Sequence, residues 1–318
     1  MRAVECRSQI GFMSLTASHG RTRVIVLSLT MLALASSVAG AQQASDSSRL
    51  ASFLVLTRKQ LQHPIRAATV DRTTMTIGNR VDGSPFVVDL TRPASPGRTP
   101  LPVVILVHGG LSDDAPVRPR SWQVYKDWST ALAASGVAAV MFDHSLGGPQ
   151  RRLDLALSEI DIVLRWVASD GARLGLKSDS VQAVGFSAAG LLAPALLRRE
   201  RPLPIARMAL FYPLTGIVTT SGPALHDDAL TARMDFNGAI QTLAKRRTPL
   251  LLIRAGSDMQ PGLLPLLDRS VSALLSADAR LEIINLPGEP HSFDLEHDTP
   301  NVRAAIERTL RFVSGKSG

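Results

Sequence analysis

The 318-residue chain lacks the residues that build disulfide frameworks and thiolate metal sites, because Cys6 is its only cysteine. Neither a disulfide network nor a cluster of thiolate ligands can therefore form. The sequence also has no HExxH motif, no glycine-rich phosphate loop and no close group of His, Asp and Glu at metal-ligand spacing. These absences exclude the common zinc and nucleotide sites, and we expect no cofactor and no metal.

Aromatic residues are scarce too, at 4% of the chain, although the formal net charge is +8. The basic residues are mostly scattered arginines. Their two clusters, residues 198–201 and 245–247, fall where helices are expected to end, and cations there complement the helix dipole. A nucleic-acid surface needs a basic stripe with interleaved aromatic residues. We therefore expect no nucleic acid partner.

Apolar runs long enough to span a bilayer are missing, since the run at residues 24–34 is too short for a stable membrane helix. It follows two arginines and precedes the small-residue triplet Ala39-Gly40-Ala41, which is the pattern of a secretory signal. A buried N-terminal helix is the alternative interpretation. We expect residues 1–41 to be a signal peptide and the protein to be exported, periplasmic or secreted, with no stable membrane anchor.

From residue 69 onward, short apolar runs alternate with amphipathic segments, which is typical of a mostly parallel sheet covered by helices on both faces. The expected strands are an antiparallel pair, 69–77 and 85–90, followed by 103–107, 137–142, 181–184, 207–212, 249–254 and 281–285. The expected helices are 122–134, 153–167, 188–199, 263–275 and 301–313, with another over 45–66. Residues 42–318 should thus form one α/β domain with about eight strands. Residues 214–248 interrupt the alternation and are interpreted as a small cap or an elaborated loop.

Ser187 is the first candidate catalytic residue, because it lies directly after an expected strand and directly before an expected helix. A serine on so sharp a turn has its hydroxyl exposed at the carboxyl edge of the sheet. The turn needs small residues on both sides, and Gly185 and Ala189 meet that need, although glycine is usual at the second position. The motif is common by chance, and its strand–turn–helix setting gives it weight.

A serine hydroxyl becomes an effective nucleophile only when a base takes its proton, and an acid must orient that base. His291 lies between the last expected strand and the last expected helix, so it should open at the same edge as Ser187. His297 is the weaker candidate for the base. Asp258, just after an apolar strand, is the expected acid, and Asp143, at the end of another strand, is its rival.

Attack on an ester carbonyl creates an oxyanion, which preorganised N–H groups must stabilise. Ala188, beside the nucleophile, supplies one candidate donor. The second should come from the loop after the first parallel strand, where the sequence is His108-Gly109-Gly110. We expect Gly110 to be the donor, with Leu111 as the alternative, and His108 to hold the loop.

Together these residues resemble the dienelactone-hydrolase-like branch of the α/β-hydrolase superfamily, over residues 103–313. Gly-Ser-Asp at 256–258 and Pro-His-Ser-Phe-Asp at 290–294 are most similar to that branch. The resemblance implies the α/β-hydrolase fold, in which the chain order serine, aspartate, histidine is the usual one. Dienelactone hydrolase itself uses a cysteine, so the serine at position 187 points to ordinary esters.

The expected function is hydrolysis of a small-molecule carboxylic ester through an acyl-enzyme. A catalytically silent α/β-hydrolase domain that binds a ligand is one alternative. A small-peptide hydrolase is another, although it needs an amine-binding acidic site that the sequence does not reveal. Residues 214–248 lack the amphipathic periodicity of a lipase lid, so short acyl esters are the expected substrates.

Overall fold

The computed structural model describes residues 50–51, 53–64, 69–111, 115–147, 152–197, 201–216 and 234–316. The expected signal peptide, residues 1–41, lies outside these residues, and so do residues 217–233 of the expected cap. The segment expected to be helical over 45–66 is helical at residues 50–51 and 53–58, and the described residues after Arg58 are not helical. No helix in these ranges is both long and apolar enough to cross a membrane.

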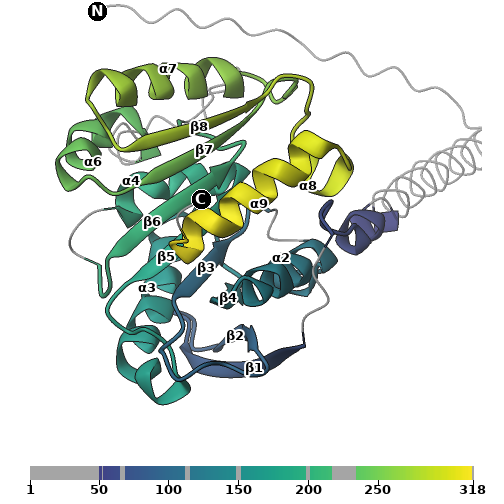
Figure 1. Cartoon of the computed structure of the whole chain (residues 1–318), viewed down its shortest axis with the longest axis vertical. Coiled ribbons are helices and arrows are strands. Elements are labelled where there is room, and N and C mark those ends of the chain that lie inside the picture. The colour runs from purple at the N-terminus through teal and green to yellow at the C-terminus, as the bar shows by residue number, and fades with distance from the viewer. Residues whose placement is uncertain are drawn as a thin grey trace, which may run out of the picture. The chain divides into compact units, whose positions relative to one another are not determined.

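The described chain contains eight strands in one sheet, in the order β1-β2-β4-β3-β5-β6-β7-β8 (Figure 1). The strands are β1 (Val70–Asn79), β2 (Pro85–Pro93), β3 (Val103–Val107), β4 (Ala138–Phe142), β5 (Val181–Phe186), β6 (Ile205–Phe211), β7 (Leu250–Ala255) and β8 (Leu281–Leu286). β1 and β2 are antiparallel to each other, and β2 is antiparallel to β4. β3 to β8 all run parallel. The predicted mostly parallel, eight-stranded sheet is confirmed.

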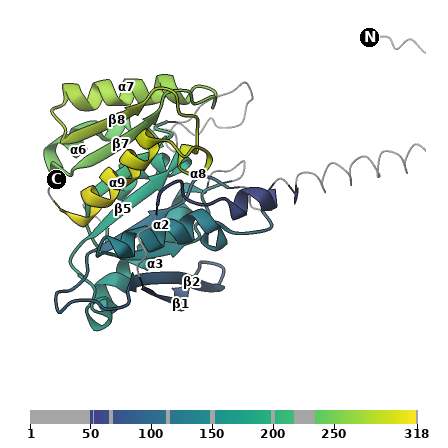
Figure 2. The same ribbon diagram turned by 45° about the vertical axis from the view of Figure 1, so that its right-hand side comes forward.

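Helices cover both faces of this sheet, as predicted. α2 (Gln123–Ala134) and α9 (Pro300–Ser314) lie over one face, in front of the strands in Figures 1 and 2. The other face carries α3 (Leu153–Asp170), α4 (Ala193–Leu196), α6 (Ile240–Arg246) and α7 (Leu263–Ser276). The short helices are η1 (Pro119–Ser121), η2 (Ala172–Leu174), η3 (Ser187–Leu191), η4 (Asn237–Ala239) and α8 (Phe293–Glu296).

The central strands are apolar throughout because side chains point alternately to two buried layers. In β3 every residue is buried, and Ile105 belongs to the same core cluster as Ile160 and Leu164 of α3. On the opposite face, Trp128 of α2 packs its ring against Phe211 of β6. Two covered faces leave only the strand ends to carry polar chemistry.

The structure differs from the sequence prediction at the helix expected over 188–199. A 3-10 helix, η3, begins at Ser187 itself, and α4 follows as a separate short helix. Pro194 explains the break, because proline has no backbone N–H to continue an α-helix begun upstream and is tolerated only in a first turn. It lies in the first turn of α4.

The structure describes residues 214–216 and 234–248 of the expected cap. Residues 234–248 form η4 and α6, and the apolar side chains of this stretch pack into the main core. Met234, Phe236, Ile240 and Leu243 are all buried there. This described end of the expected cap packs into the same core as the helices that cover the sheet.

Candidate active site

Three parallel strands deliver the predicted catalytic residues to one edge of the sheet. Ser187 follows β5, Asp258 follows β7 and His291 follows β8. Because β5 to β8 are parallel and adjacent, their carboxyl ends lie at the same edge. The topology therefore gathers residues that are far apart in the sequence.

Ser187 lies on a strained turn between β5 and η3. Its φ is 52°, in the left-handed region that non-glycine residues rarely adopt. The Ser187 carbonyl accepts a hydrogen bond from Leu214 N at 3.0 Å, which holds the turn. A Cβ built on Gly185 would lie 3.1 Å from the Ala189 methyl. The alanine is thus accommodated because position 185 carries no side chain.

The structure brings Ser187, His291 and Asp258 into one hydrogen-bonded chain. His291 Nε2 lies 2.9 Å from Ser187 Oγ, and His291 Nδ1 lies 2.6 Å from Asp258 Oδ2. The Asp258 side chain is fully buried, and its other oxygen accepts from Gln260 N at 2.9 Å. With the Nδ1 proton donated to the carboxylate, Nε2 is free to accept the serine proton.

Neither rival residue, Asp143 or His297, takes part in this series of hydrogen bonds. Asp143, at the end of β4, accepts from Arg120 N at 2.8 Å and faces the Arg120 side chain. Burial raises the pKa of Asp143. His297 Nδ1 lies 2.8 Å from Glu289 Oε2 and so is paired elsewhere. Of the candidate acids, Asp258 is the one that contacts His291.

A buried polar group behind His291 was not recognised from the sequence. The Tyr212 ring lies 4.5 Å from the His291 ring, centroid to centroid, and its hydroxyl donates to Asp294 Oδ1 at 2.6 Å. Trp128 Nε1 donates to the other Asp294 oxygen at 3.0 Å. Burial raises the pKa of Asp294. The signal in the sequence was the aspartate three residues after His291, within the stretch at 290–294 that carries the family resemblance.

The loop after β3 lies directly against the nucleophile. A Cβ on Gly109 would be 3.3 Å from Ser187 Cβ, and one on Gly110 would be 3.1 Å from Ala188 Cβ. Among the described residues, the amides of Gly110 and Ala188 donate to no protein acceptor. Leu111 N, the alternative donor, is engaged with Leu146 O at 3.3 Å. The amides of Gly110 and Ala188 are therefore available to an oxyanion.

His108 holds this loop through a second histidine, His144. The two buried rings are stacked, with centroids 3.6 Å apart and planes 4° from parallel. His108 Nε2 accepts from His144 N at 3.1 Å, while His144 Nδ1 accepts from Leu146 N at 3.2 Å. Each ring thus uses one nitrogen as an acceptor, which requires both imidazoles to be neutral.

This pair should make the fold sensitive to acid. Burial lowers the pKa of His108 to about 3, and burial also lowers the pKa of His144 well below its usual value, with Arg118 and Arg80 acting in the same direction. The unfolded chain takes up these protons near pH 6.5, so the stabilisation is complete above that pH and is lost as the pH falls toward the folded pKa. Each histidine should lower the free energy of unfolding by about 1.4 kcal/mol per pH unit in this window.

Urea unfolding between about pH 7.5 and 4.5 measures this loss. His144→Gln serves as the comparison, because it removes one titrating ring and leaves Asp143 and Asp294 in place. The stability of this variant should fall less steeply with pH than that of the wild type. Parallel curves for the two proteins would show that the His144 ring is protonated in the folded state.

Comparisons with known proteins agree with this architecture. A model of the alpha/beta hydrolase fold family matches residues 105–295, which is more than half of the chain. The chain belongs to this family. Comparison with curated protein sequences finds no match.

Several solved esterase structures share the fold. Carboxyl esterase 2 of the mycorrhizal fungus Tuber melanosporum is 21% identical, with a TM-score of 0.62 over 82% of this chain and 91% of that one. Esterase B of Lactobacillus rhamnosis is 19% identical, with a TM-score of 0.63 over 87% and 94% of the two chains. Brefeldin A esterase, a bacterial homologue of human hormone sensitive lipase, is 22% identical, with a TM-score of 0.61 over 88% and 84%.

Proposed function

We propose that this chain is a serine-dependent hydrolase of small carboxylic esters. The observation that carries the proposal is the hydrogen-bonded chain from Ser187 Oγ through His291 to the buried Asp258. Two amides that have no acceptor in the described part of the chain lie beside the nucleophile, where the oxyanion would form. The esterase names of the structural neighbours agree with this proposal.

The proposed reaction uses only these groups and water. His291 Nε2 takes the proton from Ser187 Oγ as that oxygen bonds to the acyl carbon, and the carbonyl electrons move onto the oxygen. The amides of Gly110 and Ala188 donate to this oxyanion. The tetrahedral intermediate then expels the alcohol, which takes the proton from His291. Water repeats these steps on the acyl-enzyme and releases the acid.

The finer placement in the dienelactone-hydrolase-like branch remains part of this proposal and rests on residues 256–258 and 290–294. The alternative of a silent binding domain differs from an esterase in one measurable property. A fluorophosphonate probe labels an activated serine and leaves an unactivated one unmodified. Labelling at Ser187 would therefore exclude the silent domain.

We expect the enzyme to prefer short acyl chains. Each methylene gains about 0.8 kcal/mol only where apolar protein surface receives it. The expected cap had few apolar side chains to offer, and Met234, Phe236 and Ile240 among them are packed in the core instead.

A series of nitrophenyl esters of increasing acyl length tests both the activity and this preference. The kcat/KM should be highest for acyl chains of a few carbons. The rate should show no jump when the substrate concentration passes the critical micelle concentration. Values that keep rising past about ten carbons would contradict the preference but not the esterase proposal, since each added methylene would then be gaining its transfer free energy. If the protein turns over none of the esters, the proposal itself is contradicted.

A further inference from the structure

Two loops at the carboxyl ends of the neighbouring strands β3 and β4 lie face to face. We call residues 108–111 the oxyanion loop and residues 143–147 the β4 loop. Besides the stacked rings, His144 Nε2 lies 3.1 Å from His108 O, and Leu111 N donates to Leu146 O. The oxyanion loop is thus bonded to the β4 loop at both of its ends.

The tightest contact between the two loops is at Gly147. A Cβ built there would lie 1.6 Å from Leu111 O and 2.7 Å from Leu111 C, far inside any real contact distance. The residue that it would strike directly follows Gly110, whose own N–H faces the oxyanion in the proposed reaction. The backbone of Gly147 therefore limits how far Leu111, and with it the neighbouring donor, can move toward the β4 loop.

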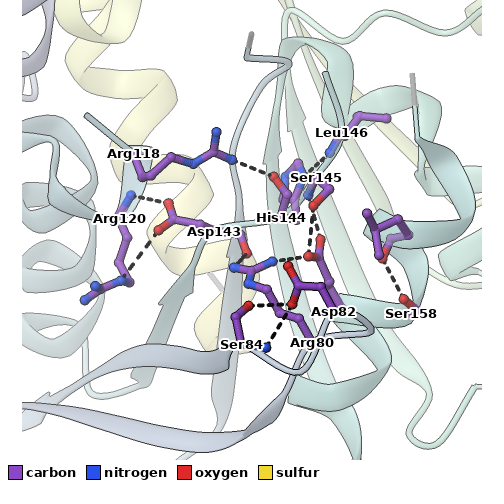
Figure 3. Close-up of polar contacts among 12 residues, drawn as sticks. Arg80, Asp82, Ser84, Arg118, Arg120, Asp143, His144, Ser145, Leu146 and Ser158 are labelled. Atoms are coloured by element: carbon purple, nitrogen blue, oxygen red, sulfur yellow. Dashed lines mark hydrogen bonds and ion pairs between the residues drawn. The ribbon is translucent and has the colours of Figure 1, made fainter. Parts of the chain in front are cut away.

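Charged side chains also hold the β4 loop (Figure 3). Glu159 of α3, almost fully buried, accepts from Ser145 N at 2.6 Å and from Ser145 Oγ at 2.9 Å. Arg80, just after β1, pairs with Glu159 and donates to Asp143 O at 2.9 Å. Arg118 donates to His144 O at 3.1 Å. Buried charges that satisfy backbone groups in this way make a loop rigid.

We propose that the β4 loop is the template that positions the oxyanion donor, with Gly147 and Glu159 as its positioning residues. The inference rests on the proposed ester hydrolysis. Oxyanion donors act only when they are preorganised within hydrogen-bond distance of the developing charge. A displacement of about 1 Å in such a site can cost roughly 100-fold in rate. Gly147 and Glu159 influence the reaction only through the position of Gly110.

The first test is Gly147→Ala, measured with a short nitrophenyl ester. The new methyl must displace Leu111, so kcat should fall by roughly 100-fold while KM changes little. The affinity for a trifluoromethyl ketone, which forms a tetrahedral adduct on the serine, should fall in parallel. Gly97→Ala is the matched control, because a Cβ at that loop position meets nothing within 4 Å.

Glu159→Gln is the second test and decides the matter if Gly147→Ala does not fold. It keeps the side-chain shape but removes the charge that holds Ser145, and we expect kcat to fall on the order of 10-fold with KM unchanged. A folded variant with wild-type kcat, or one whose loss is entirely in KM, would overturn the inference. Wild-type protein that neither hydrolyses esters nor binds the ketone would instead overturn the proposed function, and this inference with it.

Discussion

Ser187→Ala should abolish ester hydrolysis, with kcat falling by roughly 10⁵- to 10⁶-fold. The variant loses the only group that can bond to the acyl carbon in the proposed reaction. His291→Ala should be about as damaging, because nucleophile and base act as a unit and removing either one stops the same step.

The fold should survive the serine substitution. Alanine retains the Cβ, so the left-handed backbone at φ 52° is no more strained than before. Among the described residues, the side-chain hydrogen bond lost is the one to His291. Thermal unfolding and fluorophosphonate labelling should show an intact fold that takes no label. Ser276→Ala, on the exposed end of α7, is the control and should keep both activity and labelling. Residual activity within about tenfold of wild type would contradict the assignment of Ser187.

Asp258→Asn should lower kcat by roughly 10⁴-fold, whereas Asp143→Asn should be much milder. Asparagine keeps the size of the side chain but cannot stabilise the imidazolium. It also favours the tautomer in which His291 Nε2 carries the proton and so cannot accept one from Ser187. The short contact of 2.6 Å between Asp258 and His291 Nδ1 would then be made by a neutral amide.

Asp143→Asn should leave the site almost unchanged, because the amide oxygen of the new side chain can still accept from Arg120 N. Steady-state kinetics on the two variants, with unfolding curves to confirm the fold, make the comparison. The reverse order of severity would identify Asp143 as the acid and would show that the chain order serine, aspartate, histidine does not hold here.

The sequence was most informative where chemistry coincides with strand ends. Ser187, Asp258 and His291 each follow an apolar run, and parallel strands leave no choice about the edge at which those runs end. Their approach to within hydrogen-bond distance could therefore be predicted. Gly110 was preferred to Leu111 on the glycine alone, and the bond from Leu111 N to Leu146 O gives the physical reason.

The sequence was silent where a contact depends on how helices and loops pack. Glu159 lies on the buried stripe of α3, among apolar neighbours, and no motif connects it with Ser145 or Arg80. Gly147 resembles any loop glycine until the Leu111 carbonyl is placed beside it. The burial of Met234, Phe236 and Ile240 could not be predicted for a related reason, since scattered apolar residues do not show which surface they will face.

The hydrogen bonds of Asp294 order the active site before substrate binds. The Asp294 carboxylate ties together Trp128 of α2, Tyr212 at the end of β6 and the loop that carries His291, and the backbone carbonyl of Asp294 accepts from Gln62 N at 2.7 Å. The segment that carries the base is thus held by three distant parts of the chain before any substrate arrives. In such a site little ordering entropy remains for the substrate to overcome, so its binding energy can go to the transition state.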